Sequence, residues 1–191
     1  GTLTAAYLGG VDVFYTSLLS LSSGVLSIDE QAALAAWVDG GGTLIVSADY
    51  FPTEAFDSFL APFGGASFSQ VNSWDPATPG AAHALTDGVS SIAVGGPIAT
   101  TAVPDDGALL ASNALGSAFL FVQEAGTGFK SAGRIATFGD HNALTNGLIG
   151  EADNLTFAAN LAAWACGGAA PCPTDVDGSG ETDFNLSLIH I

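Results

Sequence analysis

The sequence has few basic residues, which limits the partners of this protein. Lys130 and Arg134 are its only strong bases, against 19 carboxylates in 191 residues, and the formal net charge is −17. A charge of this sign repels nucleic-acid phosphates and anionic membrane surfaces, so we expect no nucleic-acid partner. It suits a protein that works in salt or near divalent cations, because dissolved ions screen the repulsion among its carboxylates.

Long apolar runs are also absent. Every apolar stretch is interrupted by Gly, Ser, Asp or Pro before it reaches the roughly 18 residues that a membrane-spanning helix needs. We therefore predict no membrane span. Apolar residues still make up 48% of the chain, which is enough for one hydrophobic core of ordinary domain size.

Cysteine is scarce. The two cysteines, Cys166 and Cys172, stand on either side of a Gly-Gly-Ala-Ala-Pro segment. At this spacing they can close a small disulfide loop in an oxidising compartment. Alternatively, Cys172 pairs with a cysteine beyond the end of this chain, which leaves Cys166 free. Both pairings remain open on the sequence.

Methionine is missing altogether, and the chain starts at Gly1. We interpret it as a fragment that begins after any signal peptide. Its last six residues, 186–191, read Leu-Ser-Leu-Ile-His-Ile, which the nucleotide string CTGTCTCTTATACACATC encodes. That string resembles a transposase mosaic-end adaptor of sequencing libraries. We therefore treat 186–191 as adaptor-derived and exclude it, with His190, from the expected fold.

Alternating strand and helix patterns indicate an α/β fold. Residues 11–16 and 43–47 are short apolar, β-branched runs typical of buried strands. Between them, Ser27 and Glu30 form a capping box that begins a helix, and the glycines at 40–42 end it. A strand, a helix and a strand in this order predict two parallel strands joined by a helical crossover.

Further elements follow toward the carboxyl end. A short helix begins at Thr53, and a final helix spans 154–165 with an apolar face at helical spacing. Three apolar runs predict further strands, at 108–111, 118–123 and 134–138. The glycine-containing segment 125–133 predicts that the last two form an antiparallel hairpin. The expected architecture is a three-layer α/β/α sandwich over residues 1–166.

A calcium-binding loop is indicated at residues 174–185, after a linker at 167–173. In such loops oxygen ligands stand at positions 1, 3, 5, 7 and 9, and a glycine stands at position 6. These positions fall on Asp175, Asp177, Ser179, the carbonyl of Glu181, and Asp183, with Gly180 at the turn. Position 12, where a carboxylate should complete the ligand shell, is Leu186. We therefore expect this chain to bind calcium weakly.

Polar residues also follow the buried strands. Asp49 comes after the strand at 43–47, and Asp140 and His141 come after the strand at 134–138. In an open α/β sheet ligands bind outside the carboxyl ends of the strands, so these residues are candidates for a polar pocket that could hold a metal. The competing interpretation, which we favour, is that Asp49 and Asp140 cap turns and His141 is exposed.

Other catalytic patterns are weaker. A serine hydrolase would use Ser47 with His141, but the sequence around Ser47 lacks the Gly-x-Ser-x-Gly turn of such enzymes.

We interpret His83 as a turn residue before a Thr-Asp-Gly bend and not as a ligand. Asn154-Leu-Thr156 fits the glycosylation pattern, which is common by chance and here opens a helix.

Three blocks of sequence support a family resemblance. They are 26–47 with its Asp-Gly-Gly-Gly-Thr-Leu-Ile-Val, 83–89 (His-Ala-Leu-Thr-Asp-Gly-Val), and 133–140 (Gly-Arg-Ile-Ala-Thr-Phe-Gly-Asp) leading into 153–157. Together they resemble the class I glutamine amidotransferase-like superfamily, especially its non-catalytic and trehalose-utilisation-like branches. The resemblance implies a flavodoxin-like, mostly parallel sheet, with the family's first strand missing here and only the tail of its first helix, up to Tyr7 or Leu8, present.

The same resemblance bears on catalysis. Active members have a cysteine nucleophile on the turn that Ser47-Ala-Asp-Tyr50 matches here, and neither cysteine of this chain is near that turn. We therefore expect no amidotransferase chemistry, and we assign no catalytic or cofactor-binding residue.

The segment Cys172-Pro-Thr-Asp-Val-Asp-Gly-Ser-Gly-Glu-Thr-Asp-Phe-Asn185 resembles the dockerin-like calcium modules of planctomycete-type secreted proteins. The resemblance implies a second loop and a closing cysteine beyond this chain. We expect a secreted or cell-surface protein with a non-catalytic binding or assembly domain and a protein or carbohydrate partner. The alternatives are a hydrolase acting on a sugar or amide, with its site at the strand ends, and a structural spacer of a surface protein.

Overall fold

The computed structural model describes most of the expected α/β domain. The described residues are 2–16, 24–49, 53–70, 74–96, 98–128 and 132–167. The predicted calcium loop at 174–185 and the ending at 186–191 lie outside them. Cys166, directly after the last helix, is disulfide-bonded. Cys172, the other cysteine of the sequence, lies outside the described residues.

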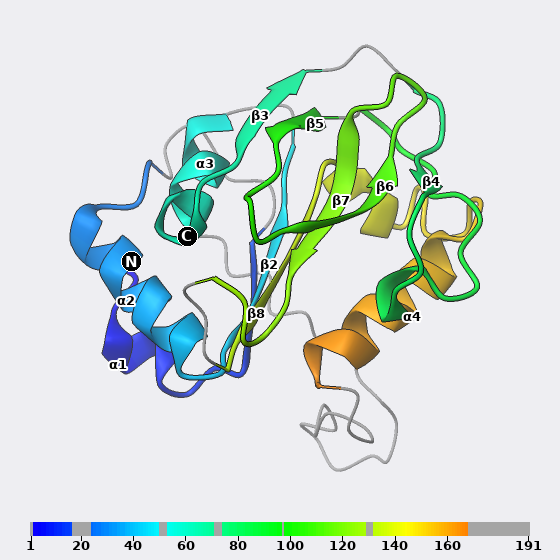
Figure 1. The fold of residues 1–191 in the computed structure, drawn as a ribbon. Helices are drawn as coiled ribbons and strands as arrows, with labels where there is room; N and C mark the ends of the chain where they lie inside the picture. Colours follow the sequence, from blue (N-terminus) through cyan, green and yellow to red (C-terminus); the bar gives the residue numbers. More distant parts are fainter. Residues whose placement is uncertain are drawn as a thin grey trace.

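A mixed sheet of eight strands forms the centre of this part of the chain (Figure 1). The strands are β1 (Val13–Thr16), β2 (Thr43–Ser47), β3 (Ser67–Gln70), β4 (Thr78–Pro79), β5 (Ile98–Ala102), β6 (Ala108–Ser112), β7 (Ala118–Gln123) and β8 (Arg134–Phe138). The main path runs β1-β2-β8-β7-β5-β3, while β6 pairs with β7 and with β4.

In the described residues four α-helices and three 3-10 turns accompany the sheet. The helices are α1 (Ala5–Leu8), α2 (Ile28–Asp39), α3 (Thr53–Leu60) and α4 (Asn154–Ala165), and the turns are η1 (Ala61–Phe63), η2 (Ala84–Thr86) and η3 (His141–Leu144). The helix expected between the cap at Ser27 and the glycines at 40–42 and the helix at 154–165 are therefore confirmed, and a helix that ends at Leu8 is present, where the resemblance implied a helix tail up to Tyr7 or Leu8. Among the described residues, no helix is long and apolar enough to cross a membrane.

The parallel crossover predicted from the first half of the chain is confirmed. β1 pairs in parallel with β2, and α2 connects them. β8 pairs in parallel with the other side of β2, and β7 pairs antiparallel with β8, as the predicted hairpin requires. β2 is thus the central strand of a parallel trio, and all five of its residues are buried.

The prediction of a mostly parallel sheet is wrong. Only the pairs β1–β2 and β2–β8 are parallel in the described sheet, while β3–β5, β4–β6, β5–β7, β6–β7 and β7–β8 are antiparallel. A parallel pair needs a long crossover, usually a helix. Between Gln70 and Arg134 the only helical element of the described segments is the three-residue turn η2, so they contain no helical crossover of the kind that joins parallel strands.

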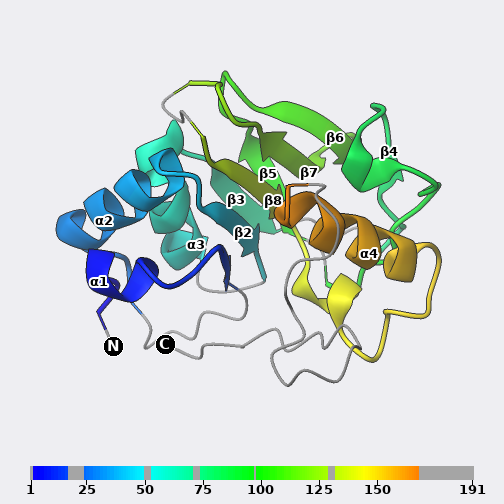
Figure 2. The ribbon, with the colours of Figure 1, turned by 90° about the horizontal axis from the view of Figure 1, so that it is seen from below.

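Two apolar clusters pack on opposite faces of the sheet. Leu44 and Val46 of β2 join the cluster that contains residues of α1, α2 and α3, and Ile45 between them joins the cluster that contains residues of α4. Successive side chains of a strand point to opposite faces, so α2 and α4 cover different faces of β2. Figures 1 and 2 agree, with α1, α2 and α3 on one side of β2 and β8 and α4 on the other.

The predicted capping box of α2 is formed in full. Ser27 Oγ accepts from the Glu30 amide, and Glu30 Oε2 accepts from the Ser27 amide at 2.9 Å. The other oxygen of Glu30 accepts from the Leu3 amide at 3.0 Å, which connects the chain before α1 to the start of α2. These bonds, with the one from Leu3 the largest cause, lower the pKa of Glu30 below its ordinary value of 4.5.

The Glu30→Gln variant is predicted to lose stability in a pH-dependent way. A carboxylate whose pKa is lower in the folded than in the unfolded state stabilises the fold above the unfolded pKa, and this contribution is lost as the pH falls through the folded pKa. Urea unfolding near pH 7 should show a loss of about 1 kcal/mol or less, the usual scale of a helix-capping interaction. In acid, below the lowered pKa of Glu30, the difference should shrink toward zero.

Glu151→Gln removes the same charge from an exposed turn and serves as the control. A loss in Glu30→Gln that is the same at both pH values, or no larger than the loss in Glu151→Gln, would contradict this account of the helix start.

Candidate functional site

The carboxyl ends of β2 and β8 lie side by side and bring the predicted pocket residues together. Ser47 is paired with Phe138 in the ladder, and the Ala48 amide continues it with a bond of 2.9 Å to the Phe138 carbonyl. Asp49 and Asp140 come next along the two chains. One side-chain ligand atom each of Asp49, Asp140 and His141 lies within 4.8 Å of the others. We call these three residues the carboxyl-edge cluster.

Asp140 is fully buried and hydrogen-bonded on both oxygens. Its Oδ1 accepts from the Asn142 amide at 2.8 Å and from Asn142 Nδ2 at 2.9 Å, and its Oδ2 accepts from the Gly95 amide. The carboxylate therefore caps the turn η3, as the turn-capping hypothesis predicted. It also holds the segment around Gly95 against the end of β8.

His141 and Asp49 form a close ion pair. His141 Nδ1 lies 2.5 Å from Asp49 Oδ2, and the two side chains are only 12% and 13% exposed. The interpretation of His141 as an exposed residue is therefore wrong, because η3 directs the ring inward against the end of β2. Since carboxylates orient imidazole rings in many active sites, this pair can position a general base or a metal ligand.

A glycine allows the close approach on which Asp140 depends. A Cβ atom at Gly95 would lie 3.0 Å from Leu148 Cδ1 and 3.1 Å from Asn142 Cβ. A larger residue would require Leu148 or Asn142 to shift by a few tenths of an ångström. The sequence pattern gave no sign of this role, because the segment around Gly95 reads as an irregular connection.

Asn154, at the start of α4, connects the segments on either side of it in sequence to the segment before Gly95. It is fully buried, its Nδ2 lies within 3.0 Å of the carbonyls of Ala93, Ala143 and Leu148, and its Oδ1 accepts from the Ala93 amide. A buried and fully bonded amide is not open to glycosylation in the folded protein. The preceding residue, Asp153, accepts from Ser90 and Ser91, and these bonds, led by the Ser90 hydroxyl, lower its pKa.

Ser47 lies at the same strand end but is sequestered. Its residue exposure is 0%, and its hydroxyl has no hydrogen-bond partner among the described residues. A hydroxyl without contact to solvent or to His141 does not meet the geometric requirement for an activated nucleophile. The structure thus gives no support to the serine-hydrolase interpretation.

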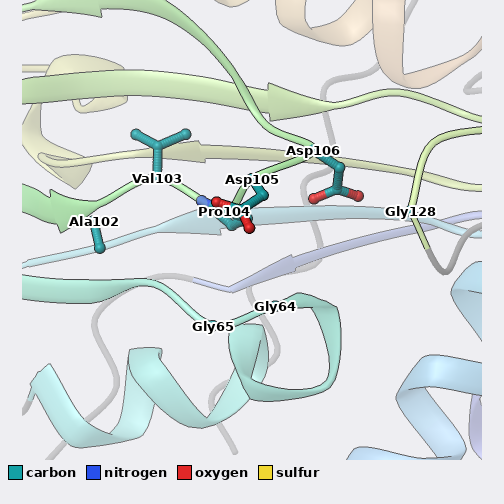
Figure 3. Close-up of a pocket in the computed structure, with 8 residues that line it drawn as sticks. All are labelled: Gly64, Gly65, Ala102, Val103, Pro104, Asp105, Asp106 and Gly128. Carbon is teal, nitrogen blue, oxygen red and sulfur yellow. The ribbon is translucent and has the colours of Figure 1, made fainter.

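A cavity that shares no lining residue with the carboxyl-edge cluster was not predicted from the sequence. It has a volume of about 430 Å3 and is lined by Gly64, Gly65, Ala102, Val103, Pro104, Asp105, Asp106 and Gly128 (Figure 3). Gln123 Nε2 donates to Asp106 Oδ1 at 2.7 Å and to the Phe63 carbonyl at 2.9 Å. A side chain at Gly128 would collide with the Asp106 carboxylate, so glycine is required beside it.

A third polar group connects η2, β7 and α4. Glu124 Oε1 accepts from Trp164 Nε1 at 2.7 Å and pairs with His83 Nε2 at 2.8 Å. His83 Nδ1 accepts from the Leu85 amide, so His83 caps η2 and is a turn residue as predicted. Arg134 lies over the Trp164 ring at 5.4 Å and donates to the Trp164 carbonyl. The group acts as a structural brace for α4.

Comparison with known families places the chain in one of them. The profile of DUF4350, described as a domain of unknown function, matches residues 14–162. The chain belongs to the DUF4350 family. No curated protein sequence matches this DUF4350 chain. The match spans β1 to α4 and therefore contains the whole carboxyl-edge cluster.

Solved structures share the fold of this DUF4350 domain at low sequence identity. A structure titled mmIFT52 N-terminal domain has a TM-score of 0.70 and 12% identity, over 90% of this chain and 84% of that one. A cytoplasmic protein of Salmonella typhimurium LT2 has a TM-score of 0.64 and 18% identity, over 84% and 74%. A ThuA-like protein of Bacteroides uniformis has a TM-score of 0.54 and 13% identity, over 85% and 72%.

Proposed function

We propose that this DUF4350 protein is a non-catalytic binding or assembly domain whose ligand site is the carboxyl-edge cluster. The observation that carries the proposal is the composition of the turn after β2. Where active amidotransferase-like proteins have a cysteine, this chain has Ser47, Ala48 and Asp49, and Asp49 is engaged with His141 at 2.5 Å. The chain therefore keeps a polar site at the strand ends without the nucleophile.

We also infer that the domain is the flavodoxin-like, three-layer α/β/α sandwich of the class I glutamine amidotransferase-like superfamily. The likeness in fold to a ThuA-like protein, at a TM-score of 0.54, supports this inference. The separate apolar clusters on the two sides of β2 support it as well. The antiparallel strands β7, β5 and β3 would then be an extension of the parallel trio.

The proposed setting is the cell surface or the extracellular medium, with the domain anchored through its dockerin-like calcium module. The support is the sequence of residues 174–185 and the surplus of carboxylates, and the expected partner is a protein or a carbohydrate. A structural spacer of a surface protein would have the same tail but no specific ligand.

A hydrolase acting on a sugar or amide is the second candidate function. The ion pair of His141 with Asp49 favours it, because a carboxylate that orients an imidazole is a common way to build a general base. With Ser47 buried, the base would have to activate a water molecule and not a side-chain nucleophile.

A binding screen with matched variants tests the proposal. Immobilised glycans and peptides should yield a ligand whose affinity falls at least about tenfold, or about 1.4 kcal/mol, in Asp49→Asn. Asp105→Asn makes the same charge change in the cavity of Figure 3 and should leave the affinity unchanged. Loss of binding in Asp105→Asn alone would show that the ligand binds in that cavity and would contradict the proposed site. Turnover of a bound sugar or amide would favour the hydrolase. A screen without any ligand would favour the spacer.

The calcium anchor is tested by calorimetric titration of the same chain. Calcium should bind weakly, with an affinity well below the micromolar range of complete sensor loops, because position 12 is Leu186. Asp175→Ala should abolish the remaining heat, because it removes the carboxylate at position 1 of the loop. Micromolar binding in the unmodified chain would show that its ligand shell is complete and would contradict the expected loop.

A further inference from the structure

We propose that the carboxyl-edge cluster is a binding site for a divalent transition-metal ion of the zinc class, held by Asp49, Asp140 and His141. This inference deepens the proposed function, since it names a ligand of the same site. The first support is the chemistry of the three side chains. One imidazole nitrogen and two carboxylate oxygens are suitable ligands for zinc and its first-row neighbours.

The spacing of the ligand atoms fits one ion. One ligand atom of each residue lies within 4.8 Å of the other two, and His141 Nδ1 lies 2.5 Å from Asp49 Oδ2. Atoms that bind one zinc ion at about 2.1 Å lie at most about 4.2 Å from each other. Side-chain shifts of less than about 1 Å would therefore bring all three to an ion between them.

Asp140 and His141 each offer an atom to which a metal can bind. Asp140 Oδ1 already has two donors, but Oδ2 has only the Gly95 amide, which leaves one acceptor position on Oδ2. His141 Nδ1 is buried and faces the Asp49 carboxylate, and an ion that binds there would release the proton that this nitrogen shares with Asp49. The nitrogen is thus placed for coordination.

The negative charge of the carboxyl-edge cluster also favours a bound cation. Two carboxylates that are almost or completely removed from solvent repel each other unless a cation lies between them. Arg134 is the only strong base among the described residues, and it lies at the opposite end of β8, about 13 Å along the strand, where it is bonded to Trp164. His141, when protonated, brings one positive charge to these two carboxylates, and a divalent ion would bring two.

The buried hydroxyl of Ser47 gives independent support for a ligand at the end of β2. Ser47 Oγ is wholly buried and has no partner among the described residues. The hydrogen bond of the Ala48 amide extends the pairing of β2 with β8 past Ser47. Side chains two residues apart in an extended strand point to the same face, so we expect the side chains of Ser47 and Asp49 to lie on one side of the sheet. A metal-bound water would give this hydroxyl a partner.

The donor set favours zinc over calcium. Calcium takes six to eight oxygen ligands, and this cluster offers two carboxylates and a nitrogen. Three protein ligands also leave an open position on zinc, to which a ligand of the domain could bind directly. The predicted calcium loop and the carboxyl-edge cluster would then be two separate metal sites with different preferences.

Calorimetry with zinc chloride on the full chain, in excess calcium to saturate the tail, tests the inference. One equivalent of zinc should bind, and Asp49→Asn and His141→Ala should each weaken binding at least about tenfold, or about 1.4 kcal/mol. The double variant Asp175→Asn/Asp177→Asn should bind zinc as tightly as the parent chain. Zinc binding that is lost only in the tail variant, or that is unchanged in both cluster variants, would overturn the inference.

Cobalt substitution gives a readout that does not depend on how well the variants fold. Cobalt bound to the parent chain should show the intense visible absorption of a four- or five-coordinate site, and zinc should displace it. Only the weak spectrum of the hydrated ion would overturn the inference. If a glycan or peptide still bound in the presence of a chelator, the proposed function would stand without the metal. If zinc bound and the screen found no ligand, the metal site would stand alone.

Discussion

The hydrogen bonds to the Asp140 carboxylate are the interaction on which the site depends. They connect three parts of the chain that are far apart in sequence, namely the end of β8, the turn η3 and the segment around Gly95. Because the carboxylate is fully buried, it is stable there only when its oxygens are satisfied. The same bonds fix the direction in which His141 leaves β8, and so they determine that it meets Asp49.

The position of the site follows from the parallel trio β1, β2 and β8. Parallel strands end at a common edge of the sheet, so their pairing alone brings together the residues that follow neighbouring strands. The antiparallel part of the sheet extends the scaffold on the far side of β8. Asn154 and the brace of Glu124, His83 and Trp164 hold α4 against one face, and the capping box of α2 holds the opposite face.

The sequence predicted the elements that have strong local signals. The capping box at Ser27, the helix at 154–165, the strands at 43–47 and 134–138 and the hairpin before β8 all agree with the structure. β3, β4 and β5 were not predicted, because they are short, rich in Ser, Thr and Ala, and formed through pairing with distant strands. Their antiparallel pairing is also what makes the sheet mixed.

The candidate site could be predicted in part. Asp49, Asp140 and His141 were identified because they follow buried strands, and the structure brings them together. Sequence alone could not separate a capping role from a ligand role, and Asp140 shows that one carboxylate can serve as a cap while keeping an acceptor position. The roles of Gly95 and Asn154 in supporting the site were not predicted, because they depend on loops that come together only in the folded chain.

Hydrogen exchange of single amides tests the central role of Asp140 most directly. In the parent chain the amides of Gly95 and Asn142 should be protected, because both donate to the buried carboxylate. In Asp140→Asn their protection should fall at least about tenfold, while the amides of Leu44 and Ile135 in β2 and β8 keep theirs. Unchanged protection at Gly95 and Asn142 in this variant would contradict the account.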